Sequence, residues 1–168
     1  YLYYAFCDQD DIWDIKKLEI AVKKLKEFSF CSPALYCSRT KYINSNDKDI
    51  GYSPLFKKEP SFNNALVQSI AGGNTMLFNH ALYEYLASID VNKNIVSHDW
   101  LAYLICMAAN GMVFYDNNSY ISYRQHEANI VGSNNNIMQV YKRIKLMLSG
   151  NFTEWVNSNL VHIDNMEL

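Results

Sequence analysis

Three carboxylates stand within four positions near the start of the chain, at Asp8, Asp10 and Asp11. Carboxylates this close repel one another unless a cation or solvent neutralises them. Hard divalent ions such as Mg²⁺ and Mn²⁺ prefer carboxylate oxygens as ligands. The cluster therefore indicates a divalent metal site. A second chemistry that the same residues allow is a phosphotransferase with Asp8 as its nucleophile.

A purely structural interpretation of this cluster stays open on sequence alone. Acidic residues favour helix N-termini, so the three aspartates could cap the following helix and solvate a turn. A calcium loop of the helix-loop-helix type is excluded, because it requires glycine at its sixth position. Counting from Asp8, that position holds Trp13.

An apolar run precedes the cluster and an amphipathic pattern follows it. The run Tyr3–Phe6 is typical of a buried strand. From about Asp14, apolar residues recur at three- and four-residue steps, which predicts a helix with one apolar face. Those residues are Ile15, Leu18, Val22 and Leu25. The aspartates should then lie on a strand-to-helix turn, and in open α/β sheets ligands bind at the carboxyl ends of strands.

Two later segments carry further candidate groups. Segment 72–75 begins with two glycines before the apolar run 76–78, and such glycines serve a plain turn or the close approach of another group. Ser97 is expected to cap a helix that ends near Asn110. Asp99 in its first turn is favoured by the helix dipole. If Asp99 faces a cleft, its carboxylate could instead accept a proton from a bound hydroxyl.

The remaining pattern predicts a succession of short strands and helices. Further strands are expected at 34–37, 76–78, 112–115 and 120–123, the last two joined by the polar turn 116–119. Further helices are expected at 62–70 with Ser61 as cap, from Asn79 to Leu86, at 137–148 and at 152–163. Residues 38–52 are polar and are expected to form a surface loop or a hairpin turn.

Composition excludes several classes of protein. A chain of 168 residues that is 49% hydrophobic and 19% charged is typical of one ordinary globular domain. The net charge of −2 makes nucleic acid an unexpected partner. The four cysteines include no Cys-x-x-Cys pair, so neither a zinc site nor a disulfide framework is expected. No apolar run reaches the roughly 20 residues that span a bilayer.

Four segments, in the same order, resemble the family 2 glycosyltransferases, and the nearest branch is the rhamnosyltransferase-like one from bacterial polysaccharide clusters. The segments are 5–13 with 17–19, 72–78, 97–100, and 123–126 with Asn129 and Gly132. They cover most of residues 1–135. Two positions depart from the pattern, since many relatives have a helix-starting proline at Ile15 and a glutamate at His98.

This resemblance implies an α/β structure with a partial GT-A fold, in which helices flank a mixed sheet. Residues 1–135 are expected to form the acceptor- and metal-binding part of a glycosyltransferase domain, and 136–168 a C-terminal helical extension. Members of the family begin with a βαβ half that holds the nucleotide base. Because no such half precedes Tyr1, we expect the chain to be the C-terminal portion of a longer protein.

The resemblance also implies roles for the candidate residues in an inverting transfer from a nucleotide-diphosphate sugar to a hydroxyl group. Asp10 is expected to bind Mn²⁺ or Mg²⁺, together with Asp8, Asp11 and His126. Asp99 is expected to be the catalytic base. Substrate contacts are expected from Asp8, Gly73, Asn74, Thr75, His98, Trp100 and Arg124.

The expected partners and location follow from the same resemblance. The acceptor should be a saccharide or a lipid-linked saccharide of bacterial surface polysaccharide synthesis, and the location cytoplasmic or peripheral to the inner face of the cell membrane. The basic helix 137–148 suits an anionic membrane surface, or is an ordinary amphipathic surface helix. Because the nucleotide half is absent, a non-catalytic carbohydrate- or protein-binding fragment is the alternative function.

Overall fold

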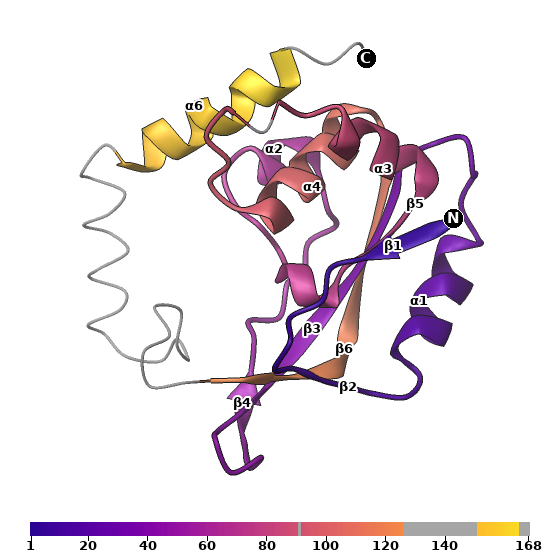
Figure 1. Cartoon of the computed structure of the whole chain (residues 1–168), viewed down its shortest axis with the longest axis vertical. Coiled ribbons are helices and arrows are strands. Elements are labelled where there is room, and N and C mark those ends of the chain that lie inside the picture. The colour runs from indigo at the N-terminus through magenta and orange to yellow at the C-terminus, as the bar shows by residue number, and fades with distance from the viewer. Residues whose placement is uncertain (91, 126–150, 165–168) are drawn as a thin grey trace.

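The computed structural model describes residues 1–90, 92–125 and 151–164 (Figure 1). Within them, six strands form one sheet in the order β1-β5-β3-β6-β2, with β4 paired to β3. The strands are β1 (Tyr3–Ala5), β2 (Ile12–Trp13), β3 (Ala34–Ile43), β4 (Asp49–Tyr52), β5 (Leu77–Asn79) and β6 (Met112–Arg124). Strands β3 and β6 are parallel and the other pairs antiparallel, so the expected mixed sheet is confirmed.

Helices cover both faces of this sheet. They are α1 (Lys17–Leu25), α2 (Phe62–Ala65), the 3₁₀ helix η1 (Gly73–Thr75), α3 (His80–Ala87), α4 (His98–Ala108) and α6 (Asn151–Asp164). Successive side chains of a strand point to opposite faces. Leu35 and Cys37 of β3 therefore pack with α2, α3 and α4, whereas Ala34 and Tyr36 pack against α1. Figure 1 shows α1 apart from the other helices, beyond the strands.

Helix α1 begins later than its sequence pattern predicts and buries only part of the predicted apolar face. The Asp14 carboxylate accepts the N–H of Lys16 at 2.8 Å, and the helix begins one residue further on. Its buried positions are Lys17, Ala21 and Leu25. Ile15 and Leu18, which the pattern assigned to the core, are 96% and 45% exposed. Leu25 and Val22 of the predicted stripe do pack in the cluster that Ala21 forms with β3, so the pattern holds only for the C-terminal part of the helix.

Between the acidic residues and α1 lies β2, a strand that the sequence pattern did not predict. Ile12 and Trp13 pair antiparallel with Ser122 and Ile121 of β6. Two residues are too few to show a strand period. The prediction of a strand-to-helix turn was therefore wrong, because the acidic segment connects strand β1 to strand β2.

The two strands predicted at 112–115 and 120–123 form one continuous strand, so the predicted turn between them was wrong. The register of β6 against β3 shifts near Asp116, where the extra residues form a bulge. The Asp116 carboxylate accepts the Asn118 N–H at 2.9 Å and the Tyr36 hydroxyl at 3.0 Å. The polar residues whose pattern predicted a turn thus form their hydrogen bonds inside a bulge, and the strand continues in the same direction.

Other boundaries differ by less. Strand β3 continues to Ile43, so the polar segment 38–52 is a hairpin whose two arms are β3 and β4. Helix α2 ends at Ala65, short of the predicted 70, although Ser61 caps it as predicted. Segment 137–148 lies outside the described residues. None of the helices that the structure describes is long and apolar enough to cross a membrane.

Asn79 connects the capping of α3 to the start of β3. Its buried carboxamide oxygen accepts the N–H groups of Leu82 at 3.1 Å and Ala34 at 3.0 Å, and its amide donates to the Ser32 carbonyl at 2.7 Å. We expect Asn79→Ala to lower the free energy of unfolding by about 2–3 kcal/mol, because it leaves buried groups without partners. Urea unfolding measures this.

The matched control is Ser61→Ala, which removes only the exposed cap of the short α2. It should cost about 0.5–1 kcal/mol. Equal losses in the two variants would contradict the role assigned to Asn79.

Candidate active site

One cavity of about 400 Å³ brings together groups that lie far apart in the sequence. Its lining includes Asp8, on the segment after β1, and Asp99, in the first turn of α4. Gly73 and Asn74 of η1 and the imidazole of His98 lie beside them. Aromatic side chains complete the wall, namely Tyr42, Phe56 and Tyr123. The volume is in the range of sites for small molecules.

Asp11 ties the acidic segment to the rest of the site. The side-chain amide of Asn74 donates to the Asp11 carboxylate, and so does the backbone N–H of Arg124. The other oxygen of Asp11 is buried and has no hydrogen-bond partner among the described residues. Burial raises the pKa of Asp11, the bond from Asn74 lowers it, and the charges of Asp8 and Asp10 raise it.

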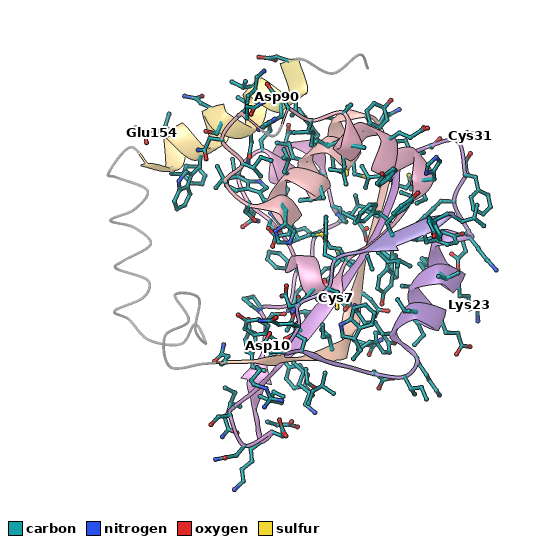
Figure 2. All side chains as sticks on the ribbon, viewed as in Figure 1. Cys7, Asp10, Lys23, Cys31, Asp90 and Glu154 are labelled. Carbon is teal, nitrogen blue, oxygen red and sulfur yellow. The ribbon has the colours of Figure 1, made fainter. Side chains whose placement is uncertain are left out.

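The charges of the three aspartates all act on one neighbouring residue, Tyr123. Tyr123 responds to all of them, since burial raises the pKa of its hydroxyl and the charges of Asp11, Asp8 and Asp10 raise it further. Figure 2 places Asp10 and Cys7 on the stretch of chain that connects β1 to β2. The acidic segment, 8–11 in the sequence, therefore faces the end of β6.

The donor set of this segment fits a divalent cation whose shell is completed by ligand oxygens. No group of three or more His, Cys, Asp or Glu side chains in the described part of the chain is arranged to hold a metal. Mg²⁺ commonly takes only one or two carboxylates in addition to water and substrate phosphates. The unpartnered oxygen of Asp11 is compatible with such a site, and the charges of Asp8 and Asp10 act on the Asp11 carboxylate; of the three aspartates, Asp8 lines the cavity. His126 lies outside the described residues.

Asp99 lines the cavity and also belongs to the helix N-terminus. Its Oδ1 accepts the N–H of Trp100 at 2.7 Å. Ser97 holds the N-cap position, but its side chain makes no capping hydrogen bond, and its carbonyl accepts the Leu101 N–H at 3.0 Å. The half-buried Asp99 carboxylate therefore lies at the N-terminus of α4 and also at the cavity wall. Its favourable interaction with the helix dipole and its exposure to a cleft are compatible.

His98 is held against the backbone of η1. Its ring meets Phe6 edge to face, with centroids 4.7 Å apart. A methyl group added at Gly73 would collide with the imidazole. The glycine therefore lets the imidazole approach the backbone of η1 closely, which is one of the two uses that the sequence left open for segment 72–75.

We expect Gly73→Ala to lower the free energy of unfolding by about 1–3 kcal/mol, because the added methyl group overpacks the contact with His98. Adding His98→Ala should recover most of that loss, since it removes the atoms that the methyl group meets. Thermal unfolding of the two single variants and the double variant measures the coupling. Additive losses would show that His98 is not the obstacle.

Two residues expected at the substrate are part of the scaffold. Thr75 is 1% exposed, and its hydroxyl donates to the Gly72 carbonyl at 2.8 Å. Trp100 is 7% exposed, and its indole donates to the Ala65 carbonyl at 2.7 Å. Neither lines the cavity. Both side chains are held in the packing around η1, α2 and α4, and their predicted substrate contacts stay predictions.

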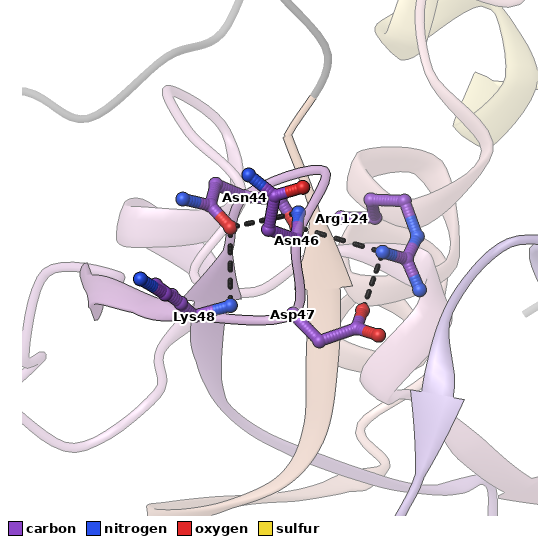
Figure 3. A network of polar contacts seen from close by, with 5 residues as sticks. All are labelled: Asn44, Asn46, Asp47, Lys48 and Arg124. Carbon is purple, nitrogen blue, oxygen red and sulfur yellow. Dashed lines mark hydrogen bonds and ion pairs between the residues drawn. The ribbon is translucent and has the colours of Figure 1, made fainter.

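Arg124 is engaged by the hairpin loop between β3 and β4 (Figure 3). Its guanidinium forms an ion pair with Asp47 and donates to the Asn44 carbonyl. The Asn44 side chain in turn accepts the N–H groups of Asn46 and Lys48 at 2.9 and 3.0 Å. In this arrangement Arg124 anchors the loop and does not line the cavity, while its backbone N–H serves Asp11.

The sequence did not single out Tyr42 or Phe56 as lining residues. Tyr42 lies on β3, where the polar pattern suggested a loop, and Phe56 follows β4 in a segment without regular structure. Each is an aromatic residue in a chain that contains 13 tyrosines and 8 phenylalanines, so composition carries no signal for them.

The chain is similar to known proteins both in sequence and in structure. No family model matches the chain. The dTDP-rhamnosyl transferase RfbG of Shigella flexneri is 29% identical over 170 residues, which cover 98% of this chain and 56% of that protein. The crystal structure of S. aureus TarS 1-349 in complex with UDP-GlcNAc matches with a TM-score of 0.53 and 16% identity, over 99% of this chain and 44% of that one.

These matches agree with the motifs and with the sheet. The structural likeness concerns the fold alone, because the sequence identity is low, whereas the sequence match runs along almost the whole chain. The chain spans about half the length of both proteins. In sequence the chain resembles a dTDP-rhamnosyl transferase, and in fold it resembles the TarS structure, in agreement with the resemblance to family 2 glycosyltransferases that the motifs carry.

Proposed function

We propose that the chain forms the acceptor-side and metal-binding part of a glycosyltransferase. This enzyme would move a sugar from a nucleotide diphosphate to a hydroxyl group, with inversion at the anomeric carbon. The observation that carries the proposal is the single cavity that Asp8 and Asp99 both line. Because the curated relative is named as a dTDP-rhamnosyl transferase, dTDP-rhamnose is the first donor to test.

Asp99 is the proposed general base. A carboxylate at the cavity wall can take the proton of an acceptor hydroxyl while that oxygen attacks the anomeric carbon and the bond to the diphosphate breaks. Attack from the face opposite the leaving group is a single displacement and needs no enzyme nucleophile. The bond from the Trp100 N–H to Asp99 orients the carboxylate at the helix N-terminus.

Asp10, Asp8 and Asp11 are the proposed ligands of Mn²⁺ or Mg²⁺, with His126 as a further candidate. Such an ion, when bound, supplies positive charge that offsets the negative charge of the departing diphosphate. The chain's own contribution is to hold the ligands in place. Asn74 and the Arg124 N–H fix Asp11, and Asn74 also lines the cavity, where it can donate to sugar hydroxyls.

The proposed setting is bacterial surface polysaccharide synthesis in the cytoplasm, with a saccharide or lipid-linked saccharide as acceptor. This part of the proposal is supported by the resemblance to enzymes of polysaccharide clusters. An enzyme that works on lipid-linked saccharides would act at the inner face of the cell membrane.

A donor screen of the full-length gene product tests the proposal. The protein is incubated with dTDP-, UDP- and GDP-sugars and a saccharide acceptor, in Mn²⁺, in Mg²⁺ or in excess chelator. We expect nucleoside diphosphate release from one donor, dTDP-rhamnose first, and its loss in chelator. Absence of release from every donor in both metals would contradict the proposed activity.

A further inference from the structure

Lys17 is a buried cation that lies over the ring of Trp13. It is the first residue of α1 and only 3% exposed, whereas Lys16 and Lys23 of the same region are exposed to solvent. Its Nζ lies 3.2 Å from the centroid of the Trp13 ring. Among the described residues it has no hydrogen-bond acceptor. A lysine ammonium in this position is unusual, because fully buried lysines are rare unless they are paired.

The charge of Lys17 acts on the candidate site. Burial lowers the pKa of its ammonium to about 8, while the neighbouring Cys7, Asp11 and Asp8 oppose that shift. Two of these groups are proposed metal ligands. The Trp13 ring, on which the ammonium rests, belongs to β2, which directly follows the acidic segment and is paired with β6. The cation is thus held on an aromatic ring, and its charge acts on two carboxylates of the acidic segment.

Packing alone does not account for this residue. Removing an ammonium from water is costly, and replacing a buried charge by an apolar side chain of similar volume is often neutral or stabilising. Methionine would fill the same space against Trp13 without that cost. What methionine cannot supply is a positive charge that acts on the carboxylates of Asp11 and Asp8.

We propose that Lys17 is a positioning residue for donor binding, whose ammonium holds the carboxylates of Asp8 and Asp11 against their mutual repulsion. It also reduces the negative potential that the diphosphate of the donor meets at the cavity. This inference rests on the proposed function. On this inference Lys17 favours donor binding and lowers the stability of the fold, so a substitution should change these two properties in opposite directions.

The test compares Lys17→Met, Lys17→Arg and the control Lys23→Met in the full-length gene product. The donor KM and kcat are measured at saturating divalent metal, and the thermal midpoint is measured on the same samples. We expect Lys17→Met to raise the donor KM about tenfold or more, with kcat within about threefold of wild type. Its thermal midpoint should be unchanged or higher. Lys17→Arg should restore most of the donor affinity, and Lys23→Met should behave as wild type.

Two results would overturn the inference while leaving the proposed function intact. One is a wild-type donor KM in Lys17→Met. The other is an equal loss in Lys17→Met and Lys17→Arg with a lowered thermal midpoint, which would indicate packing and not charge. A wild-type protein that transfers no sugar would overturn the proposed function, and the role of Lys17 with it.

Discussion

Asp99→Asn should reduce sugar transfer by about 10²–10⁴-fold while donor binding stays within about twofold of wild type. Asparagine keeps the shape of the side chain and the bond from the Trp100 N–H, so α4 and the cavity wall remain in place. It cannot accept the proton of the attacking hydroxyl. Steady-state transfer and equilibrium binding of the donor, both in the full-length gene product, separate these two effects.

The matched control is Asp90→Asn. Asp90 is an exposed aspartate before α4, and its carboxylate accepts the Asn92 N–H at 3.0 Å in a local turn. This variant should transfer sugar at the wild-type rate. Full activity in Asp99→Asn, or a parallel loss of donor binding, would remove Asp99 from the role of base.

Asp10→Ala should lose donor affinity and metal dependence together. Because a direct ligand is removed, we expect the donor KM at fixed Mn²⁺ to rise at least about 100-fold, and the residual rate to respond little to added metal. Titration of the transfer rate with Mn²⁺ in wild type and variant measures both effects. The fold should be retained, since the Asp11 bonds to Asn74 and to the Arg124 N–H do not involve Asp10.

Glu19→Ala serves as the control for Asp10→Ala, because it removes an exposed carboxylate from the first turn of α1, outside the cavity lining. It should keep the wild-type metal response. If Asp10→Ala keeps a normal metal response as well, the acidic segment is not the metal site.

Local signals predicted two of the three helix caps, since Ser97 makes no side-chain capping bond, and they predicted the general order of the elements. Asn79 and Ser61 cap α3 and α2 as their side-chain chemistry indicates, because each oxygen accepts an N–H in the first turn. Asp8 and Asp99, which come from two of the four family motifs, line the same cavity. What joins them is a fold that brings the segment after β1 beside the N-terminus of α4.

Motifs did not reveal which side chain within each motif faces the cavity. In segment 97–100, Asp99 lines it, whereas Trp100 is buried against Ala65. In segment 72–75, Asn74 reaches Asp11, whereas Thr75 turns back to Gly72. The local backbone geometry sets the direction in which each side chain points. The residue types in a motif do not determine that geometry.

Lys17 shows a second reason why part of the site could not be predicted. The apolar pattern from Ile15 does not include Lys17, yet Lys17 is the first residue of α1 and is buried. Burial of a lysine depends on tertiary contacts, here with Trp13, that have no counterpart in the periodicity.

Paramagnetic broadening by Mn²⁺ tests the central claim most directly, because it locates the cation without relying on activity. NMR amide signals of this chain are recorded during a Mn²⁺ titration in wild type and in Asp10→Ala. The account predicts that signals of Gly73, Asn74 and Asp99 broaden first. Cys31, which Figure 2 shows at the other side of the molecule from Asp10, should keep its signal, and the variant should lose the selective broadening. Broadening centred away from the cavity, or unchanged by Asp10→Ala, would contradict it.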